Sequence, residues 1–537
     1  MNEGRELWKE YCGFLDKSFS EQIEYSEKKK DEFFEKWKHT KTASHICPEG
    51  VTKFEDIPIT TYKDYPILHE FGEKMEHLSQ TVPRNKGESW WDYYDRIGRQ
   101  AAPMLDGWMV DRYALCLKTS GTSGESKWFA QGEGYLRNMI KYIIAYTIIG
   151  CSDDWGDTKI RKGDKIVSLL APPPYGSGCA AKAFDSIFCC VPPTQIAENI
   201  TDMRKKMDMV LKAIERGEKI EFIAALPSTS YLISQFLTAP ATVFKDKYQS
   251  MKPGVAKFIL YLKYLQSKLK PPKHKKVSEF LSLKGVGIGG AGYGLYLNSL
   301  KEQYGVDPCN LYVSSEGGMS LIASFKYKEH FIPVLENDYF EFMTKDDEIK
   351  KIDELEKGNE YTLIITAFGS MAVRCNSGDM FKVVDFEDNG LPIFSFESRV
   401  IGSIDIYGYL NLSEALASKA LLKAGLGATD TWVIAKLTEP IEHLLLLMEK
   451  EWDYSEEEAS RAVFDALKDL SEDFRNLISD FKIEQPTKFI EVEYLPKGAF
   501  MRYFIKRAKE GLPYGQMKPL KLINPEQSKI IELLRGI

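Results

Sequence analysis

The chain of 537 residues lacks the cysteine and histidine spacings on which most zinc sites are built. Its nine cysteines include no Cys-x-x-Cys pair, and its seven histidines form no His-Glu-x-x-His pattern. Zinc-binding modules and zinc hydrolases depend on such spacings, so both classes are excluded. Cys189 and Cys190 are adjacent and the other cysteines are scattered, which is typical of a protein from a reducing compartment.

Long apolar runs are missing as well. The first ten residues are polar and no apolar core follows them, so we expect no signal peptide. The longest apolar runs, residues 142–149 and 444–448, are too short to span a bilayer. The sequence therefore predicts a soluble, cytoplasmic protein with no membrane partner.

An excess of positive charge is also absent. The chain has 71 basic and 78 acidic residues, a net charge of −7, which argues against a nucleic-acid partner. One basic cluster, from Lys268 to Lys276, is interrupted by Pro271 and Pro272. We interpret this cluster as a solvated loop in preference to a site for polyanions.

What the chain does contain is the material for a large core. Hydrophobic residues make up 44% of it and aromatic residues 12%, and its length suits roughly two to four domains. Residues 1–45 have helical periodicity, and further on strand-like runs alternate with helical ones. The strand-like runs are 165–171, 221–226 and 280–288, and a helical run covers 203–216. This alternation predicts an α/β fold with a largely parallel sheet, in which ligands bind beyond the carboxyl ends of the strands.

Beyond about residue 330 the pattern changes to strands joined by polar turns. We expect strands at 339–343, 361–367, 371–374 and 381–385, followed by a break near Ser398 and Arg399. After the break come expected helices at 412–424, 441–449 and 455–470 and strands at 432–436 and 489–494. The sequence thus predicts a large domain at 1–398 and a small α+β domain at 399–537.

The segment from Lys118 to Lys127 is rich in small hydroxyl residues and glycine. It lies between a strand-like run at 113–117 and a helical run that begins near Tyr135. Glycine allows backbone N–H groups to approach phosphate oxygens closely, so the segment can be a phosphate-binding loop. It is not a Walker A loop, because Ser126-Lys127-Trp128 stands where Gly-Lys-Ser/Thr is required. Taken alone, it is equally well explained as an ordinary turn.

Three further segments carry polar groups that suit a nucleotide. Residues 311–318, Leu-Tyr-Val-Ser-Ser-Glu-Gly-Gly, offer a ring to a base, hydroxyls to a phosphate and a carboxylate to Mg²⁺. Residues 372–379 end in Ser-Gly-Asp, where Asp379 can accept both hydroxyls of a ribose. Residues 515–519 offer Lys518 to a phosphate. Each segment alone also fits an ordinary strand end or turn.

In their order along the chain, these motifs resemble those of the adenylate-forming superfamily of acyl-CoA synthetases, peptide-synthetase adenylation domains and luciferases. The motifs are Thr-Ser-Gly-Thr-Ser-Gly-x-x-Lys, Tyr-x-Ser-Ser-Glu and Arg-x-x-x-Gly-Asp. Within the superfamily, the chain is most similar to the Gretchen Hagen, auxin-responsive branch of acyl acid amido synthetases. Three groups of residues carry this similarity. Near the N-terminus these are Asp56-Ile57-Pro58-Ile59 with Tyr62 and Asp64-Tyr65, and further on Tyr339-Phe340-Glu341-Phe342. The third group is in the tail and consists of Gly498, Phe500, Ala508, Gly511, Gln516, Lys518 and Pro519.

The resemblance covers nearly the whole chain and implies a ligase that works in two half-reactions. ATP and a carboxylic acid would first give an acyl-adenylate and pyrophosphate. An amine, usually an amino acid, would then attack the acyl carbon and release AMP, after the small domain has reoriented. The implied ligands are ATP and Mg²⁺, together with a small-molecule acid and an amine.

The resemblance also implies a role for each matching residue. Tyr312 would pack against adenine, Ser314 or Ser315 would contact the α-phosphate, Glu316 would coordinate Mg²⁺, and Asp379 would bind the ribose. The β- and γ-phosphates of ATP would be held by Ser120, Gly121, Thr122, Ser123, Gly124 and Lys127. Lys518 would complete the adenylation site, with Lys497 and Lys506 as alternatives. Arg399 would begin the inter-domain linker and is counted with the nucleotide-binding candidates.

Some features depart from the family pattern or leave alternatives open. The linker's hinge Asp is absent, and Ile401 and Gly402 stand in its place, although a glycine pivot can also serve a domain rotation. Residues 172–178 and 227–231 line the acid pocket or only close the sheet, and no basic residue in them indicates a second carboxylate on the substrate. Two other functions stay open: an acyl-CoA ligase that uses the CoA thiol, and a catalytically silent nucleotide-binding protein.

Overall fold

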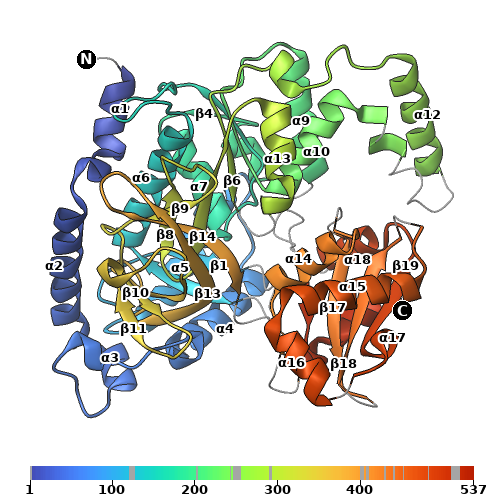
Figure 1. Ribbon diagram of the computed structural model, residues 1–537. Coiled ribbons are helices and arrows are strands. Elements are labelled where there is room, and N and C mark those ends of the chain that lie inside the picture. Colours follow the sequence, from blue (N-terminus) through green and yellow to red (C-terminus); the bar gives the residue numbers. More distant parts are fainter. Residues whose placement is uncertain are drawn as a thin grey trace.

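The computed structural model describes most of the chain (Figure 1). The described residues are 3–119, 127–200, 203–241, 243–245, 255–289, 293–399, 404–406, 410–427, 431–439, 442–450, 453–481, 483–509 and 521–536. The fold is mixed α/β, with large mixed sheets and helices, which confirms the predicted fold class.

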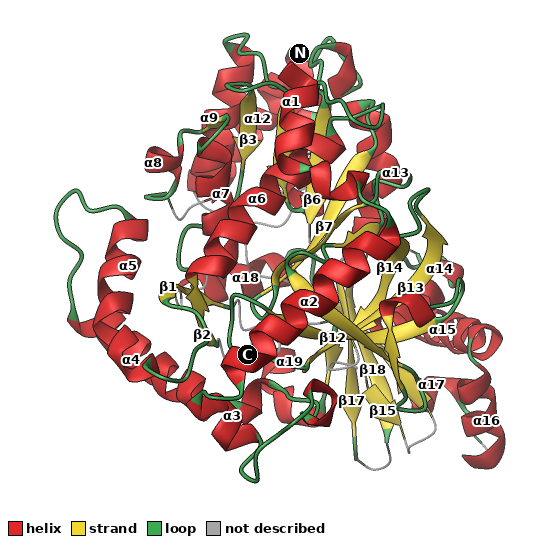
Figure 2. Cartoon of the chain, turned by 90° about the vertical axis from the view of Figure 1, so that its left-hand side faces the viewer, coloured by secondary structure: helices red, strands yellow, loops and turns green. Residues whose placement is uncertain are grey.

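The N-terminal segment is helical, as its periodicity predicts. Its helices are α1 (Glu3–Tyr11), α2 (Phe19–Trp37), α3 (Lys41–Ile46), α4 (Pro66–Thr81) and α5 (Trp90–Ala101). Helix α2 begins at a capping box, in which the Ser18 side chain accepts from the Glu21 amide and the Glu21 side chain accepts from the Ser18 amide. Figure 2 shows α2 running across the strands of the main sheet, and it packs on β10.

The main sheet has twelve strands among the described residues, in the order β11-β10-β12-β13-β14-β9-β8-β7-β6-β5-β3-β4. One half is parallel: β3 (Lys165–Ser168), β4 (Cys189–Val191), β5 (Phe222–Ala225), β6 (Gly285–Gly289) and β7 (Pro308–Ser314). The connections between these strands carry α7 (Gly176–Asp185), α8 (Thr194–Ala197), α9 (Met203–Glu215), α10 (Pro227–Thr238), α12 (Val255–Leu269) and α13 (Tyr293–Tyr304). Helices on a parallel sheet bury its strands, which explains why β5 is apolar throughout.

The other half of the sheet is antiparallel, so the predicted largely parallel sheet holds only for the first half. Its strands are β8 (Gly318–Ala323), β9 (Phe331–Pro333), β10 (Asp338–Met343), β11 (Ile349–Lys351), β12 (Glu360–Ala367), β13 (Cys375–Phe386) and β14 (Pro392–Arg399). The strand predicted at 371–374 is wrong. Arg374 has a φ of 42°, a left-handed conformation that ends the extended path, and β13 starts only at Cys375.

A two-stranded sheet of β1 (Tyr113–Lys118) and β2 (Trp128–Gly132) flanks the segment predicted to bind phosphate. Helix α6 (Glu133–Gly150) follows β2 directly, and every residue from Tyr142 to Gly150 in it is buried. The apolar run at 142–149 is therefore a core helix. Among the described residues, no helix is both long enough and apolar enough to cross a membrane.

The C-terminal segment, orange to red in Figure 1, has apolar clusters of its own. They are formed by residues between Ile404 and Leu534, whereas the other clusters contain residues up to Phe394. The strands are β15 (Ile404–Ile406), β16 (Leu410–Leu412), β17 (Trp432–Leu437), β18 (His443–Glu449), β19 (Ile490–Leu495) and β20 (Leu522–Ile523). The helices are α14 (Glu414–Lys423), α15 (Glu456–Leu470), α16 (Glu472–Phe481), α17 (Pro486–Phe489), α18 (Ala499–Lys509) and α19 (Lys529–Arg535).

The helix predicted at 441–449 is wrong, because β18 occupies this place between β17 and β19. Every residue of β18 is buried, and its residues 444–448 form a continuous apolar run without alternation. Such a run cannot be distinguished from a buried helix by periodicity alone. The domain boundary between residues 398 and 399 stays a prediction.

Candidate active site

The turn between β7 and β8 carries the Ser-Ser-Glu-Gly segment at the centre of the main sheet. The Ser314 hydroxyl accepts a hydrogen bond from the Gly317 amide at 2.9 Å and closes the turn. Gly318 has a φ of 75°, a conformation that favours glycine, and it starts β8. Glu316 therefore stands at the tip of a short, internally bonded turn where one strand ends and the next begins.

Three side chains from other elements hold the carbonyl groups of this turn. Gln131 of β2 donates its amide to the Ser315 carbonyl, and Asn337 donates to the Gly317 carbonyl at 2.9 Å. The Tyr135 hydroxyl of α6 lies 3.4 Å from the Ser314 carbonyl oxygen. The turn is thus fixed to β2 and to α6, the elements that follow the predicted phosphate loop.

Tyr312 and Asp379 meet across two strands that are far apart in sequence. The Tyr312 hydroxyl donates to Oδ2 of Asp379 at 2.6 Å. The Tyr312 ring is half-buried and meets the Phe381 ring edge-on, with centroids 5.1 Å apart. Asp379 is 5% exposed and is paired in register with Arg399 of β14. The residues predicted to take adenine and ribose are therefore in direct contact.

Lys127 closes the base of the predicted phosphate loop. Its amide donates to the Thr119 hydroxyl at 2.9 Å, and its carbonyl accepts from the Thr119 amide at 2.8 Å. The Lys127 ammonium lies 4.9 Å from the centre of the Tyr62 ring, in a cation–π contact. The Tyr62 hydroxyl reaches the Trp128 carbonyl at 3.3 Å, so Tyr62 fixes the strand that leaves the loop.

Two titratable groups, Tyr62 and Cys375, lie near the predicted site residues Lys127 and Glu316. Burial raises the pKa of Tyr62 to about 12, and the charge of Glu316 adds to this effect. Burial also raises the pKa of Cys375, with Glu316 raising it further and Lys127 opposing it. Cys375 thus lies within the electric field of both charges, and it begins the strand that carries Asp379.

The predicted site residues fall into two groups. The structure brings together Lys127, Tyr312, Ser314, Ser315, Glu316 and Asp379. The other candidates Ser120, Gly121, Thr122, Ser123, Gly124 and Lys518 lie outside the described residues, and of Arg399 only the backbone of β14 is described. All these assignments stay predictions.

Four residues of the site had no predicted role: Tyr62, Gln131, Tyr135 and Asn337. Tyr62 belongs to a motif that supported the family resemblance, so this residue carried a signal. The other three hold backbone carbonyls, and no sequence pattern marks such a contact.

Below the turn lies a buried carboxyl group, that of Asp338. Burial raises its pKa to about 8, although the Ser320 hydroxyl and the Asn337 amide lie beside it and lower the pKa. Among the described residues, neither of its carboxyl oxygens has a hydrogen bond of normal geometry. A Cβ atom on Gly317 would come within 3.0 Å of Asp338 Oδ2 and would collide with Ser320 Oγ. The Glu316 turn therefore packs directly on Asp338 and requires glycine at 317.

The side chains at this turn suit a magnesium ion that takes most of its ligands from elsewhere. No group of three or more His, Cys, Asp or Glu side chains among the described residues could hold a metal ion alone. Mg²⁺ commonly takes one or two carboxylates and completes its shell with water and substrate phosphates. The single carboxylate of Glu316, together with the predicted phosphate loop, would meet this requirement.

Comparisons with known proteins concern the fold and its central segment. Residues 321–399 match the family model described as the GH3 family central domain. The solved structure of GH3.15 acyl acid amido synthetase is 15% identical, with a TM-score of 0.65 over 96% of this chain and 94% of that chain. A structure of AtGH3.15 acyl acid amido synthetase in complex with 2,4-DB is 14% identical, with a TM-score of 0.64 over 96% and 93%.

A structure of 2-hydroxyisobutyryl-CoA ligase in the postadenylation state, in complex with R3-HIB-AMP, is 13% identical. Its TM-score is 0.53 over 96% of this chain and 92% of that chain. No curated protein matches the chain. The chain therefore shares the fold of these acyl acid amido synthetase and CoA ligase structures. The family-model match of residues 321–399 is to the GH3 family.

Proposed function

We propose that the protein is an ATP- and Mg²⁺-dependent ligase that joins a carboxylic acid to an amine, in particular an amino acid. The observation that carries this proposal is the convergence of Lys127, Glu316, Tyr312 and Asp379 around one turn. These are the groups that hold the phosphates, the metal, the base and the ribose of ATP in such a reaction.

In the first half-reaction, a carboxylate oxygen of the acid attacks the α-phosphorus of ATP, and pyrophosphate leaves. Tyr312 and Asp379 hold the nucleoside, and Ser314 or Ser315 contacts the α-phosphate. Lys127, together with the loop of Ser120, Gly121, Thr122, Ser123 and Gly124, holds the outgoing phosphates. Glu316 would hold Mg²⁺, which neutralises charge on the phosphate oxygens. Lys518 is our candidate for the lysine that completes this site.

In the second half-reaction, the amine nitrogen attacks the acyl carbon, AMP leaves, and the nitrogen gives up a proton. The large segment, 1–398, would hold the adenylate while the small segment, 399–537, reorients between the two steps. No protein nucleophile is required, because positioning and charge neutralisation carry both steps.

The nearest alternative is an acyl-CoA ligase, which shares the first half-reaction and uses the CoA thiol in the second. The fold comparison favours the amide former, since the TM-score is 0.65 with GH3.15 and 0.53 with the CoA ligase. A catalytically silent nucleotide-binding protein is the third candidate. The presence of Lys127, Glu316 and Asp379 together favours an active enzyme over this candidate.

The test is pyrophosphate release from ATP and Mg²⁺ with a panel of carboxylic acids, first without an acceptor and then with amino acids or CoA. We expect acid-dependent release that falls at least a hundredfold in Glu316→Gln. Glu24→Gln, a change of the same type on the exposed side of α2, serves as the matched control. The acceptor that sustains turnover decides between amide and thioester. ATP binding without release for any acid would support the silent binder.

A further inference from the structure

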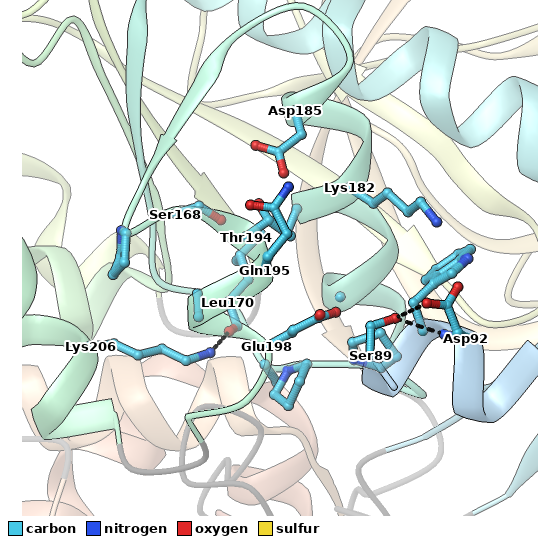
Figure 3. Close-up of a pocket in the computed structure, with 18 residues that line it drawn as sticks. Ser89, Asp92, Ser168, Leu170, Lys182, Asp185, Thr194, Gln195, Glu198 and Lys206 are labelled. Carbon is cyan, nitrogen blue, oxygen red and sulfur yellow. Dashed lines mark hydrogen bonds between the residues drawn. The ribbon is translucent and has the colours of Figure 1, made fainter. Parts of the chain in front are cut away.

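A cavity of about 260 Å³ lies between α5, the segment after β3, and helices α7, α8 and α9 (Figure 3). Much of its wall is apolar and includes Trp91, Leu170, Pro172, Pro173 and Pro192. One water takes about 30 Å³ of liquid volume, so the cavity would hold about eight or nine waters. It therefore suits a small molecule of similar heavy-atom count.

One wall of this cavity carries a buried ammonium group. Lys206, in the first turn and a half of α9, is 2% exposed, and its Nζ donates to the Leu170 carbonyl at 2.8 Å. Among the described residues, no carboxylate lies within 4.0 Å of this ammonium group. Burial lowers the pKa of Lys206 to about 8. A buried cation that no carboxylate of the described residues pairs with is costly, so an anionic group of a ligand would relieve this cost.

Another part of the wall carries carboxyl groups. Burial raises the pKa of Glu198, and the charge of Asp92 raises it further, while Lys182 and Arg84 oppose this effect. Figure 3 shows the Glu198 carboxyl group between Lys206 on one side and Ser89 with Asp92 on the other. A cationic group of a ligand would therefore be favoured on the Glu198 side of the cavity.

We propose that this cavity binds a free amino acid as a zwitterion, with its carboxylate on Lys206 and its ammonium group on the Glu198 and Asp92 side. The N-terminal end of α9 adds a favourable field for the carboxylate. The binding of an amino acid to this cavity is a claim that does not depend on the proposed ligase reaction. The further step, that the bound amino acid is the acceptor, rests on the proposed function.

The test is calorimetric titration of the full-length protein with the twenty amino acids. For any amino acid that binds, the matching amine without a carboxylate and the matching acid without an amino group are titrated as well. We expect only the zwitterion to bind, and Lys206→Met to weaken it at least tenfold. Lys205→Met, an exposed neighbour on the same helix, should bind as the wild type does.

Two further measurements distinguish loss of the Lys206 ammonium group from a general structural effect of the Lys206→Met change. Glu198→Gln should also weaken binding of the zwitterion, although this residue lies outside α9, directly after α8. At pH 8.5 the wild type should take up a proton on binding, seen as a heat that depends on the buffer, and Lys206→Met should not. Failure of all amino acids to bind, or equal binding by Lys206→Met, would overturn the proposal. Binding without pyrophosphate release would instead contradict only the ligase function.

A separate observation concerns α12 (Val255–Leu269), which exposes large apolar side chains to solvent. Phe258 is 61% exposed, Leu262 48%, Leu265 36% and Leu269 83%. These positions follow the i, i+4, i+7, i+11 spacing of one helix face, whereas Ser267 on the other side is buried. Contiguous exposed apolar side chains of this kind mark a surface that binds a protein, a membrane or a ligand.

The segment that carries this face is rich in lysine, although Lys276 pairs with Glu302 of α13 at 3.1 Å. Residues 255–277 include seven lysines and no Asp or Glu, in a chain with a net charge of −7. Lys263 and Lys268 stand on the helix, and the remaining lysines include Lys270, Lys273 and Lys275 of the loop that follows. Such a basic amphipathic helix fits an anionic lipid surface, because apolar side chains enter the interface while lysines meet the headgroups.

We infer that α12 and the basic loop after it dock the protein onto an anionic membrane surface. This inference differs from the sequence predictions of a solvated loop and of no membrane partner, which stay predictions. The helix would lie in the interface, consistent with the finding that no described helix can cross a membrane.

Co-sedimentation of the full-length protein with phosphatidylcholine vesicles, with and without phosphatidylserine, tests this inference. We expect binding only to the anionic vesicles, weaker at high salt and lost in the triple variant Phe258→Ser, Leu262→Ser, Leu269→Ser. Leu422→Ser, an equally exposed residue of α14, should leave binding unchanged. No binding, or unchanged binding by the triple variant, would overturn the inference. A dimer in sedimentation equilibrium that the triple variant abolishes would assign the face to a second copy of the chain.

Discussion

Arg374 and Glu341 form a buried ion pair with two hydrogen bonds. Nε and Nη2 of Arg374 donate to the two oxygens of Glu341 at 2.9 and 2.8 Å, and both residues are less than 9% exposed. Nη1 of Arg374 donates to the carbonyls of Glu55 and Ile57, each at 2.6 Å. The pair therefore joins three segments that are far apart in sequence, just before the strand that carries Asp379.

Removing one partner of this pair should destabilise the protein severely. Arg374→Met leaves Glu341 charged and buried without a partner, which typically costs about 3–5 kcal/mol of unfolding free energy. Urea unfolding of Arg374→Met, Glu341→Met and the double variant measures this effect. The double variant should be more stable than either single variant, because no unpaired charge remains. A double variant whose loss is the sum of the single losses would show that the two residues are not coupled.

This pair shows what sequence reasoning could and could not predict. The motifs around Ile57, Glu341 and Arg374 all contribute to the family resemblance, but periodicity is local and does not say which distant segments meet. The positive φ of Arg374 depends on its tertiary partners, so the strand predicted at 371–374 was wrong. The sequence gives no signal for the position of Lys206 for the same reason, since a helical connection brings it to residues 170–173 from more than thirty residues along the chain.

The raised pKa of Asp338 predicts how the unfolding free energy of the protein changes with pH. Its ordinary value is 3.8 and its value in the folded protein is about 8, so the folded state keeps a proton that the unfolded state releases. The contribution to stability is full below pH 3.8 and is lost as pH rises toward 8, by at most about 1.4 kcal/mol per pH unit. The Asp338→Asn variant does not have this loss. Its unfolding free energy, relative to that of the wild type, should therefore rise as the pH is raised from 5 to 8.

Urea unfolding of both proteins at pH 5, 6, 7 and 8 measures the difference. A difference that stays constant over this range would show that Asp338 is ionised in the folded state. The same measurement on Asp346→Asn, a change at an exposed turn, should give a constant difference and serves as the control.

Tyr312→Phe should weaken ATP binding and leave the fold intact. The variant keeps the ring and removes only the hydroxyl that donates to Asp379 at 2.6 Å. A hydrogen bond to a charged group contributes about 1.5–3 kcal/mol, so the KM for ATP should rise roughly tenfold or more, with a smaller change in kcat. Initial rates of pyrophosphate release at varied ATP measure this. An unchanged KM would mean that the hydroxyl does not orient Asp379 for the ribose.

Gly317→Ala should damage the turn that carries Glu316. The added Cβ would collide with Ser320 Oγ and press on Asp338, so either the turn or β8 must shift. A shift of this size at a positioning turn is expected to lower kcat at least a hundredfold, with a smaller effect on stability. Gly13→Ala, where nothing lies within 4 Å of the added atom, should behave as the wild type. Wild-type activity in Gly317→Ala would show that the turn does not need its present position.

Glu316 should determine how much Mg²⁺ the enzyme needs. A metal that takes most of its ligands from phosphates and water depends strongly on its single protein carboxylate. Chelation with EDTA should abolish pyrophosphate release in the wild type, and added Mg²⁺ should restore it. In Glu316→Gln the Mg²⁺ concentration for half-maximal rate should rise at least tenfold, whereas Glu24→Gln should titrate as the wild type does. If Glu316→Gln keeps the wild-type Mg²⁺ curve and only its maximal rate falls, Glu316 acts on the nucleotide or the acid and another group holds the metal.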